Sequence, residues 1–206
     1  MNTLLYTTTA ALVAISAHEA AHGFVSYKLG DPTPKLDGRL SLNPFVHLDL
    51  WGTLCMLIFH MGWAKPVRIN PAYYKDQKKG IILVSLAGPI TNYLLAFVSL
   101  ILYFFLYCRF DWIAFWFYYL AVLNIGLGTF NLIPLPPLDG SNVLQELFPT
   151  ISQFYRKIRP YSWLILSLCL VTGLLNTPLS YANSRILDTM WKLVRFFFYH
   201  PAGTII

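Results

Sequence analysis

The stretch ISAHEAAHGF, residues 15–24, places two histidines and a glutamate inside an apolar segment that runs from residue 4 to residue 27. A helix needs about 20 apolar residues to cross the hydrocarbon core of a bilayer, so this segment is long enough to span it. An ionisable side chain at mid-membrane costs at least about 2.5 kcal/mol and usually marks a functional position. The stretch therefore predicts a membrane helix that carries part of a functional site.

The composition of the whole chain agrees with a membrane setting. Hydrophobic residues make up 56% of the 206 positions and charged residues only 12%, with a mean hydropathy of +0.54. In soluble domains, charged residues account for roughly a quarter. No Lys or Arg precedes Lys28, so the N-terminus lacks the basic region of a cleavable signal peptide and is interpreted as the start of the first span. The three cysteines are far apart and odd in number, which indicates free thiols.

Hydropathy predicts the fold class. Four stretches are long enough to span a bilayer, at residues 4–27, 81–107, 112–133 and 161–179. A shorter apolar stretch at 50–63 is bracketed by glycines and is expected to re-enter the membrane or lie at its surface. Charged residues between 185 and 195 recur at helical spacing opposite apolar ones, which predicts an interfacial amphipathic helix. We expect an all-α polytopic membrane protein with four to five membrane-embedded helices, a re-entrant or β-containing connection and a C-terminal amphipathic helix.

The chain is expected to form one domain with a defined orientation. Neither repeats nor low-complexity linkers divide residues 1–206, so we expect a core over about 4–145, followed by an extra span and the interfacial helix over 161–200. Most of the 15 Lys and Arg residues fall in the polar connections at 28–49, 64–80 and 134–160. The positive-inside tendency places these connections on the cytoplasmic side. The net charge of +6 is thus a topology signal, with anionic lipid headgroups as partners, and nothing indicates nucleic acid.

The ionisable residues of the first span have metal-site spacing. His18 and His22 are one helical turn apart, so both imidazoles lie on the same face and can reach one cation. Glu19 is close enough to act on a water molecule beside that cation. The pattern H-E-x-x-H on a helix is the arrangement of zinc hydrolases. A polar packing cluster, or a proton relay in a transporter, is the alternative interpretation.

A third ligand is expected from the stretch GTFNLIPLPPLDG, residues 128–140. Its prolines lack backbone donors and cannot continue the preceding helix, so they form a stiff, non-helical arm that ends in Asp139. Such backbone near membrane depth is tolerated only where it lines a protein cavity or water. Two histidines and one aspartate leave the fourth tetrahedral position of a zinc ion open for water, as a catalytic site requires. Asp139 acting only as a cap on the next helix fits the spacing equally well.

Two amides and one connecting segment complete the candidate site. Asn92 and Asn131 lie in the two spans expected to face the metal, where either could donate a hydrogen bond to an oxyanion. Each fits an interhelical packing hydrogen bond as well. Residues 64–70, AKPVRIN, alternate like an edge strand that could pair with an unwound substrate segment. A plain surface loop is the alternative for this segment.

Three motifs together resemble one known family. HEAAH in the first span, AGPITN at residues 87–92 and NLIPLPPLDG at 131–140 match, in order and spacing, the site-2 protease family of intramembrane zinc metalloproteases. The resemblance covers roughly residues 10–145 and is closest to short bacterial and archaeal members that lack PDZ and CBS domains. One departure is that the family's usual N-P-D-G is here P-P-L-D-G, with Asn131 further upstream.

The resemblance implies site residues and a function. His18, His22 and Asp139 would hold one zinc ion per chain, and Glu19 would be the catalytic acid and base. The expected activity is hydrolysis of peptide bonds in or near transmembrane segments of membrane proteins, as in regulated intramembrane proteolysis. The alternative is a metal or proton transporter that uses the same cluster. The expected location is the bacterial or archaeal cell membrane, with the active site towards the cytoplasm; the sequence does not indicate the oligomeric state.

Overall fold

The computed structural model describes residues 2–47, 49 and 65–198. Within those residues every regular element is a helix, which confirms the predicted all-α fold. The α-helices are α1 (Asn2–Lys28), α2 (Thr33–Leu36), α3 (Pro44–His47), α5 (Gln77–Leu106), α6 (Asp111–Asn131), α7 (Asp139–Leu147), α8 (Pro149–Ile158), α9 (Ser162–Val171) and α10 (Asn176–Phe198). Two short 3-10 helices are η1 (Pro71–Tyr73) and η2 (Arg159–Tyr161). The predicted re-entrant stretch, 50–63, lies outside the described residues.

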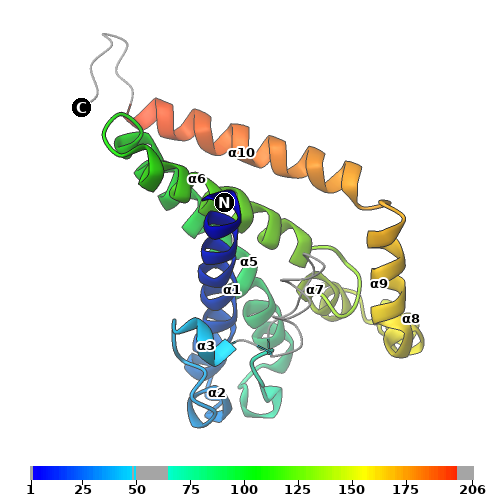
Figure 1. Cartoon of the computed structure of the whole chain (residues 1–206). Coiled ribbons are helices and arrows are strands. Elements are labelled where there is room, and N and C mark those ends of the chain that lie inside the picture. The colour runs from blue at the N-terminus through cyan, green and yellow to red at the C-terminus, as the bar shows by residue number, and fades with distance from the viewer. Residues whose placement is uncertain (1, 48, 50–64, 199–206) are drawn as a thin grey trace.

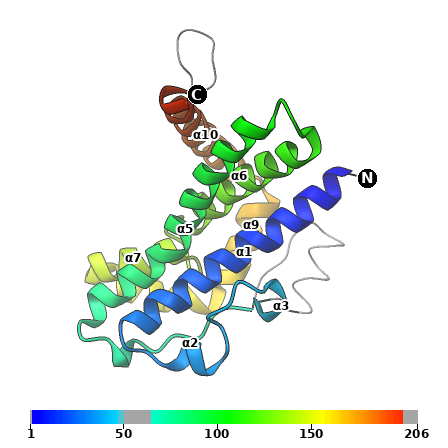
Figure 2. The same cartoon turned by 90° about the vertical axis from the view of Figure 1, so that its left-hand side faces the viewer.

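Three long helices form the centre of the molecule. Helices α1, α5 and α6 each contact the other two. They run side by side in Figure 2, whereas in the view of Figure 1 α6 crosses α1 obliquely. Their bounds agree closely with the predicted stretches at 4–27, 81–107 and 112–133. Helix α5 starts cleanly because Asp76 caps it, accepting a hydrogen bond from the Lys79 amide at 3.0 Å. This three-helix packing brings the motif of α1 against the middle of α5.

The structure supports fewer spans than the hydropathy pattern predicts. Helices α5 and α6 are long and apolar enough to cross a membrane, and a third span results if the bent pair 149–171 and 176–198 is one. Helix α1 is long enough but does not reach the same hydropathy, because His18, Glu19 and His22 interrupt its apolar run. The described part of the chain is thus all-helical, with two or three candidate spans.

The predicted fourth span, residues 161–179, does not form one helix. Helix α9 ends at Val171, and Gly173 follows with a φ of 70°, a left-handed conformation that favours glycine. The Gly173 amide donates to the Leu170 carbonyl at 3.1 Å and so closes the end of α9. The chain restarts at Asn176 with Pro178 in the first turn of α10, where a missing backbone donor costs nothing. The helix axis bends by 79° between residues 149–171 and 176–198.

The C-terminal helix is confirmed as helical and packs on the core. Its residue Val194 is fully buried in one cluster with Leu100 of α5 and Ile125 of α6. Helix α10 runs along α6, on the side of the molecule opposite to α2 and α3 (Figure 1). Its interfacial position in a membrane stays a prediction.

The predicted β-containing connection is not seen as a strand. Residues 65–70 are non-helical, and no strand pairing occurs in the described part of the chain. The segment is nevertheless fixed against α1, because the Val67 amide donates to Glu19 and the Asn70 amide donates to Asp31. Its role as an edge for substrate pairing stays a prediction.

Candidate metal centre

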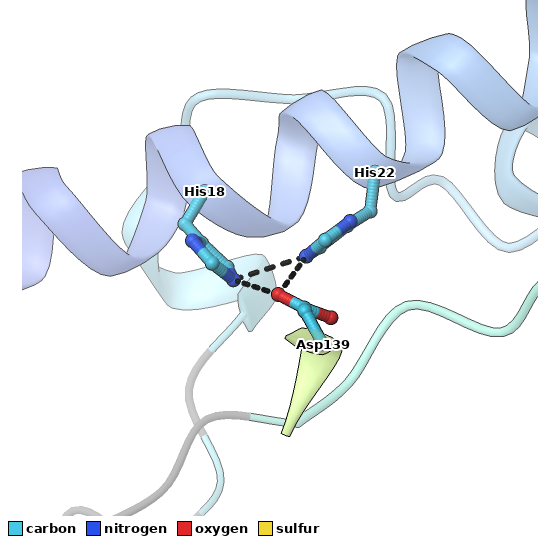
Figure 3. Close-up of side chains that lie close together, drawn as sticks. All are labelled: His18, His22 and Asp139. Carbon is cyan, nitrogen blue, oxygen red and sulfur yellow. Dashed lines mark hydrogen bonds and ion pairs between the residues drawn. The ribbon is translucent and has the colours of Figure 1, made fainter. Parts of the chain in front are cut away.

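The predicted ligands meet at one point. His18 and His22 project from one face of α1, and α7 begins at Asp139, whose carboxylate points between the two rings (Figure 3). The Nε2 atoms of the histidines are 3.0 Å apart, and Asp139 Oδ2 lies 3.2 Å from the first and 3.3 Å from the second. Of the His, Cys, Asp and Glu residues in the described chain, these three alone form such a group. The structure therefore assembles the set that the sequence suggested.

Hydrogen bonds fix both imidazoles with a bare nitrogen towards the carboxylate. His22 Nδ1 lies 2.7 Å from the Val84 carbonyl, which can only accept, so this nitrogen carries the proton. His18 Nδ1 lies 2.6 Å from Asn92 Oδ1 and likewise donates. In the neutral form of each ring, Nε2 then presents its lone pair towards Asp139. A hydrogen bond at the remote nitrogen is the usual way in which a protein orients a metal-binding histidine.

The three converging atoms fit a zinc ion. With both imidazoles neutral, two lone pairs and a carboxylate oxygen at 3.0–3.3 Å repel one another unless a cation lies between them. Asp139 Oδ2 is buried and accepts no hydrogen bond of normal geometry within the described residues. A tetrahedral zinc with ligands about 2.0–2.1 Å away holds neighbouring ligand atoms about 3.3 Å apart. The donor set and its spacing therefore match zinc.

Two glycines allow the elements to approach this closely. A Cβ at Gly88 of α5 would lie 2.5 Å from His18 Cε1 and 2.5 Å from His22 Nε2. A Cβ at Gly140 would overlap the Leu132 carbonyl at the end of α6. Gly88 thus gives space to the imidazoles, and Gly140 lets α7 start directly against α6. Asp139 is aimed at the histidines for this reason, and it does not cap α7, whose first residue it is.

Glu19 lies beside the ligand group and outside it. Its Oε2 accepts a hydrogen bond of 3.0 Å from the Val67 amide. With the three ligands it lines a cavity of about 260 Å³, to which Pro66, Val67 and Asn131 also contribute. The carboxylate is therefore held at the edge of the space where a substrate carbonyl and a water molecule would meet.

The two predicted amides occupy different places. Asn131 lines the cavity, with its Nδ2 donating to the Leu127 carbonyl at 3.0 Å. Asn92 is fully buried behind His18, and its Nδ2 donates to Asn124 Oδ1 at 2.7 Å and to the Ala14 carbonyl at 3.2 Å. Asn131 therefore lies in the cavity as an oxyanion donor would, and that role stays a prediction. Asn92 has the geometry of the alternative, a hydrogen bond between helices that also orients His18.

Sequence reasoning overlooked three contributors to the site. Asn124 holds the Asn92 amide, Gly88 makes room for the imidazoles, and the Val84 carbonyl orients His22. Asn124 had a sequence signal, because a buried amide in an apolar span needs a partner. Gly88 lies in the motif AGPITN, which indicated the family but assigned this glycine no role. The Val84 carbonyl had no signal, since a backbone group is invisible in the residue type.

A buried carboxylate anchors the segment that holds Glu19. Asp31 accepts hydrogen bonds from the Asn70 amide at 2.7 Å, the Ser26 hydroxyl at 2.8 Å and the Thr33 amide at 2.9 Å. Burial alone would raise the pKa of Asp31, but these hydrogen bonds outweigh it and hold the pKa below its ordinary value. Ser26 in turn contacts the Tyr74 hydroxyl at 2.7 Å. Residues 70–74 are thereby tied to the end of α1.

We predict that Asp31 stabilises the fold in a pH-dependent way. Its pKa is lower in the folded than in the unfolded chain, so the stabilisation is present above the unfolded pKa and is lost as pH falls through the folded pKa. Asp31→Asn should lower the free energy of unfolding at neutral pH by about 1–3 kcal/mol. The measurement is the melting temperature in detergent between about pH 7 and about pH 2.5, on both sides of the unfolded value near 3.9. A gap between the two proteins that stays constant in acid would contradict this.

Comparison with known proteins identifies similar sequences. The family model described as Peptidase family M50 matches residues 107–173, a range that includes Asp139 but not the two histidines. No solved structure matches the chain.

Several curated proteins are similar over longer ranges. The chain is 40% identical over 146 residues to "Putative zinc metalloprotease YwhC" of Bacillus subtilis, covering 67% of each chain. It is 30% identical over 178 residues to "Putative zinc metalloprotease Rip2" of Mycolicibacterium smegmatis, covering 80% of this chain and 66% of that one. "Putative zinc metalloprotease MJ0611" of Methanocaldococcus jannaschii is 33% identical over 123 residues, covering 58% of this chain and 56% of that one. The alignments thus span roughly half to two thirds of these relatives.

Proposed function

Because this chain belongs to peptidase family M50, we propose that it is a zinc-dependent endopeptidase that cleaves peptide bonds in or near transmembrane segments of other membrane proteins. The names of the relatives support the metal and the reaction class, since each is called a zinc metalloprotease. The candidate spans α5 and α6 support the membrane setting. Regulated intramembrane proteolysis, in which such a cut releases part of the substrate, belongs to the same proposal.

One observation carries the proposal: three ligand atoms at 3.0–3.3 Å from one another, with a carboxylate that is not a ligand beside them. Zinc held there by His18, His22 and Asp139 supplies a Lewis acid and lowers the pKa of water towards about 7. Glu19 takes the proton of the attacking water and later gives it to the leaving amine. The Val67 amide occupies Glu19 Oε2, so Oε1, which accepts no hydrogen bond within the described residues, is the oxygen available for this transfer.

Transport of metal or protons is the alternative function for the same cluster. A transporter needs ionisable or polar groups along a path to both membrane faces. The parts of α5 and α6 remote from the metal centre, residues 93–106 and 112–123, contain no charged side chain. The lack of charged side chains in these parts of α5 and α6 suits a hydrolase better than a transport path through the membrane.

The test uses purified protein in liposomes with a fluorescent membrane-protein substrate. We expect cleavage that stops when a chelator removes zinc and returns when zinc is restored. The same vesicles, loaded with a zinc-sensitive dye, report transport. Movement of zinc without cleavage of any membrane substrate would overturn the protease proposal.

Substitutions of the two amides, Asn131 and Asn92, are predicted to change different quantities. Asn131→Leu should leave zinc binding intact and lower kcat by about 10²–10³-fold, because an oxyanion donor is lost. Asn92→Leu should instead weaken zinc binding by about 10–100-fold, because His18 loses the acceptor that orients it. Zinc titration and steady-state cleavage separate the two effects. Loss of zinc affinity in the Asn131 variant would show that its amide supports the ligands and not the oxyanion.

We further propose that the metal centre faces the cytoplasm. The support is the charge distribution, since the connections on the metal side, 28–49, 64–80 and 134–160, hold most of the basic residues. Lys75 is exposed in one of them. A Lys75→Cys variant without the native cysteines should resist impermeant thiol reagents in intact cells and react after lysis. Efficient labelling of intact cells would reverse the orientation.

A further inference from the structure

A second cavity lies far from the metal centre. It forms where the end of α5, the start of α6 and the end of α10 meet, and its volume is about 860 Å³ (Figure 1). Along α5 it begins at Tyr103, fifteen residues beyond Gly88, which corresponds to about 22 Å of helix. The residues that line it are Tyr103, Phe104, Tyr107, Cys108, Phe115, Tyr118, Trp191 and Arg195. Nothing in the proposed proteolytic reaction uses these residues.

The walls of this cavity are aromatic and held in place by one another. Tyr103 contacts the rings of Tyr107, Tyr118 and Trp191, with centroids 5.4, 5.4 and 5.6 Å away. Such tilted and edge-on pairs are favourable arrangements of aromatic side chains. The cavity therefore combines a rigid apolar wall with several hydroxyl groups.

One cation and no carboxylate belong to the lining. The Arg195 guanidinium lies over the Trp191 ring, 5.9 Å from its centroid, and makes no ion pair with any described residue. A guanidinium is a preferred partner for phosphate, to which it can donate two parallel hydrogen bonds. The charge of this cavity is thus complementary to an anion.

The position of the cavity indicates the kind of anion. Helix α5 ends at Leu106 and α6 begins at Asp111. If these two candidate spans cross the bilayer, the turn between them lies at a membrane–water boundary. Tyrosine and tryptophan gather at that depth because their rings are apolar and their polar ends reach water. A ligand at this depth can place hydrocarbon against the rings and a phosphate on Arg195.

We propose that this cavity is a binding site for an anionic phospholipid. Its phosphate pairs with Arg195, and the parts of its acyl chains nearest the headgroup lie against Tyr103 and Trp191. A zwitterionic lipid is a poorer match, because the lining offers its ammonium group no carboxylate and the guanidinium already covers the Trp191 face. A soluble phosphate lacks the hydrocarbon that the aromatic wall would contact.

Cys108 allows a direct test, because it lines the cavity and is exposed. In a Cys55→Ser, Cys169→Ser protein in detergent, the rate of maleimide reaction at Cys108 is measured with and without phosphatidylglycerol. Bound lipid should cover the thiol, and lipid at about four times its Kd should slow the reaction about fivefold. Phosphatidylcholine and glycerophosphate at equal concentration should have little effect.

Arg185 provides a matched control on the same helix. It also lies over an aromatic ring, 5.8 Å from the centroid of Tyr181, but neither residue lines the cavity. Arg195→Gln should abolish the protection of Cys108 by phosphatidylglycerol, whereas Arg185→Gln should retain it and Arg195→Lys should retain most of it. Each variant is compared with itself without lipid, and its melting temperature reports folding.

Three results would overturn the proposal. Equal protection by phosphatidylcholine would mean a non-specific micelle effect, and equal protection by glycerophosphate would mean a soluble anion site. Unchanged protection in a folded Arg195→Gln protein would remove the phosphate contact. If Arg195→Gln does not fold, the comparison between the two lipids on the Cys108 protein decides.

Discussion

Glu19→Gln is expected to retain about one zinc ion per chain while cleavage falls by about 10²–10⁴-fold, the usual contribution of a general base. The amide keeps the shape of the carboxylate and its Oε can still accept from the Val67 amide, so the segment beside the site stays in place. It has no basic oxygen that can take the proton of the attacking water. Zinc content by elemental analysis and cleavage of a reconstituted substrate provide the two readouts.

Asp139→Ala and His22→Ala should lose both zinc and cleavage. Each substitution removes one of three ligand atoms, and Asp139 is the only anionic one among them. The contrast between these variants and Glu19→Gln separates holding the metal from moving the proton. If Glu19→Gln cleaves at nearly the wild-type rate, Glu19 is not the base, although the metal centre would stand.

Gly88→Ala is expected to disrupt the metal centre although it touches no substrate. The new methyl group would lie 2.5 Å from His18 Cε1 and from His22 Nε2, and both rings are held by hydrogen bonds at their other nitrogens. Either the imidazoles turn away from Asp139 or α1 and α5 move apart. We expect zinc affinity to fall by at least about 10–100-fold, as when the groups that orient a metal ligand are lost.

Gly126→Ala is the matched control for this substitution. It also adds one methyl group to a long core helix, but the nearest atom is Asn183 Nδ2 at 3.8 Å, an ordinary contact. Alanine also favours the helix interior over glycine by about 1 kcal/mol. Zinc affinity and melting temperature of this variant should match or exceed those of the wild type. Normal zinc binding by Gly88→Ala would mean that α5 shifts freely, contrary to the close packing described above.

Local spacing predicted the histidine pair because helix geometry constrains it, whereas for Asp139 the spacing fitted a helix cap equally well and the family resemblance indicated a ligand. Two histidines one turn apart must share a helix face, and the prolines before Asp139 must end a helix. Both facts are independent of tertiary packing. The helices α1, α5 and α6 were predictable for a similar reason, since apolar length dominates their pattern.

The features of the fold and the site that the sequence did not predict depend on packing between residues far apart in the chain. Whether Asn92 faced the substrate or His18 was decided by the rotation of α5 against α1, which residue types do not record. The break within 161–179 occurs at Gly173, where a positive φ ends the helix. Because spanning helices otherwise tolerate glycine, the residue type alone did not predict this break. The contact between Glu19 and the Val67 backbone amide had no side-chain signal at all.

The origin of the ligands makes the metal a cross-link as well as a cofactor. His18 and His22 belong to α1, and Asp139 is the first residue of α7, after the third long helix. A bound ion therefore joins the first helix of the core to the segment that follows its last long helix. Binding that occurs only in the folded chain stabilises it by RT ln(1 + [L]/Kd), about 2.7 kcal/mol at a hundred times the Kd. The zinc concentration should therefore affect the half-life of the protein in a membrane. The metal-free chain should be degraded faster by the proteases of quality control than the zinc-bound chain. A shorter half-life under zinc limitation, matched by Asp139→Ala in zinc-replete cells but not by Glu19→Gln, would be the sign of this second role.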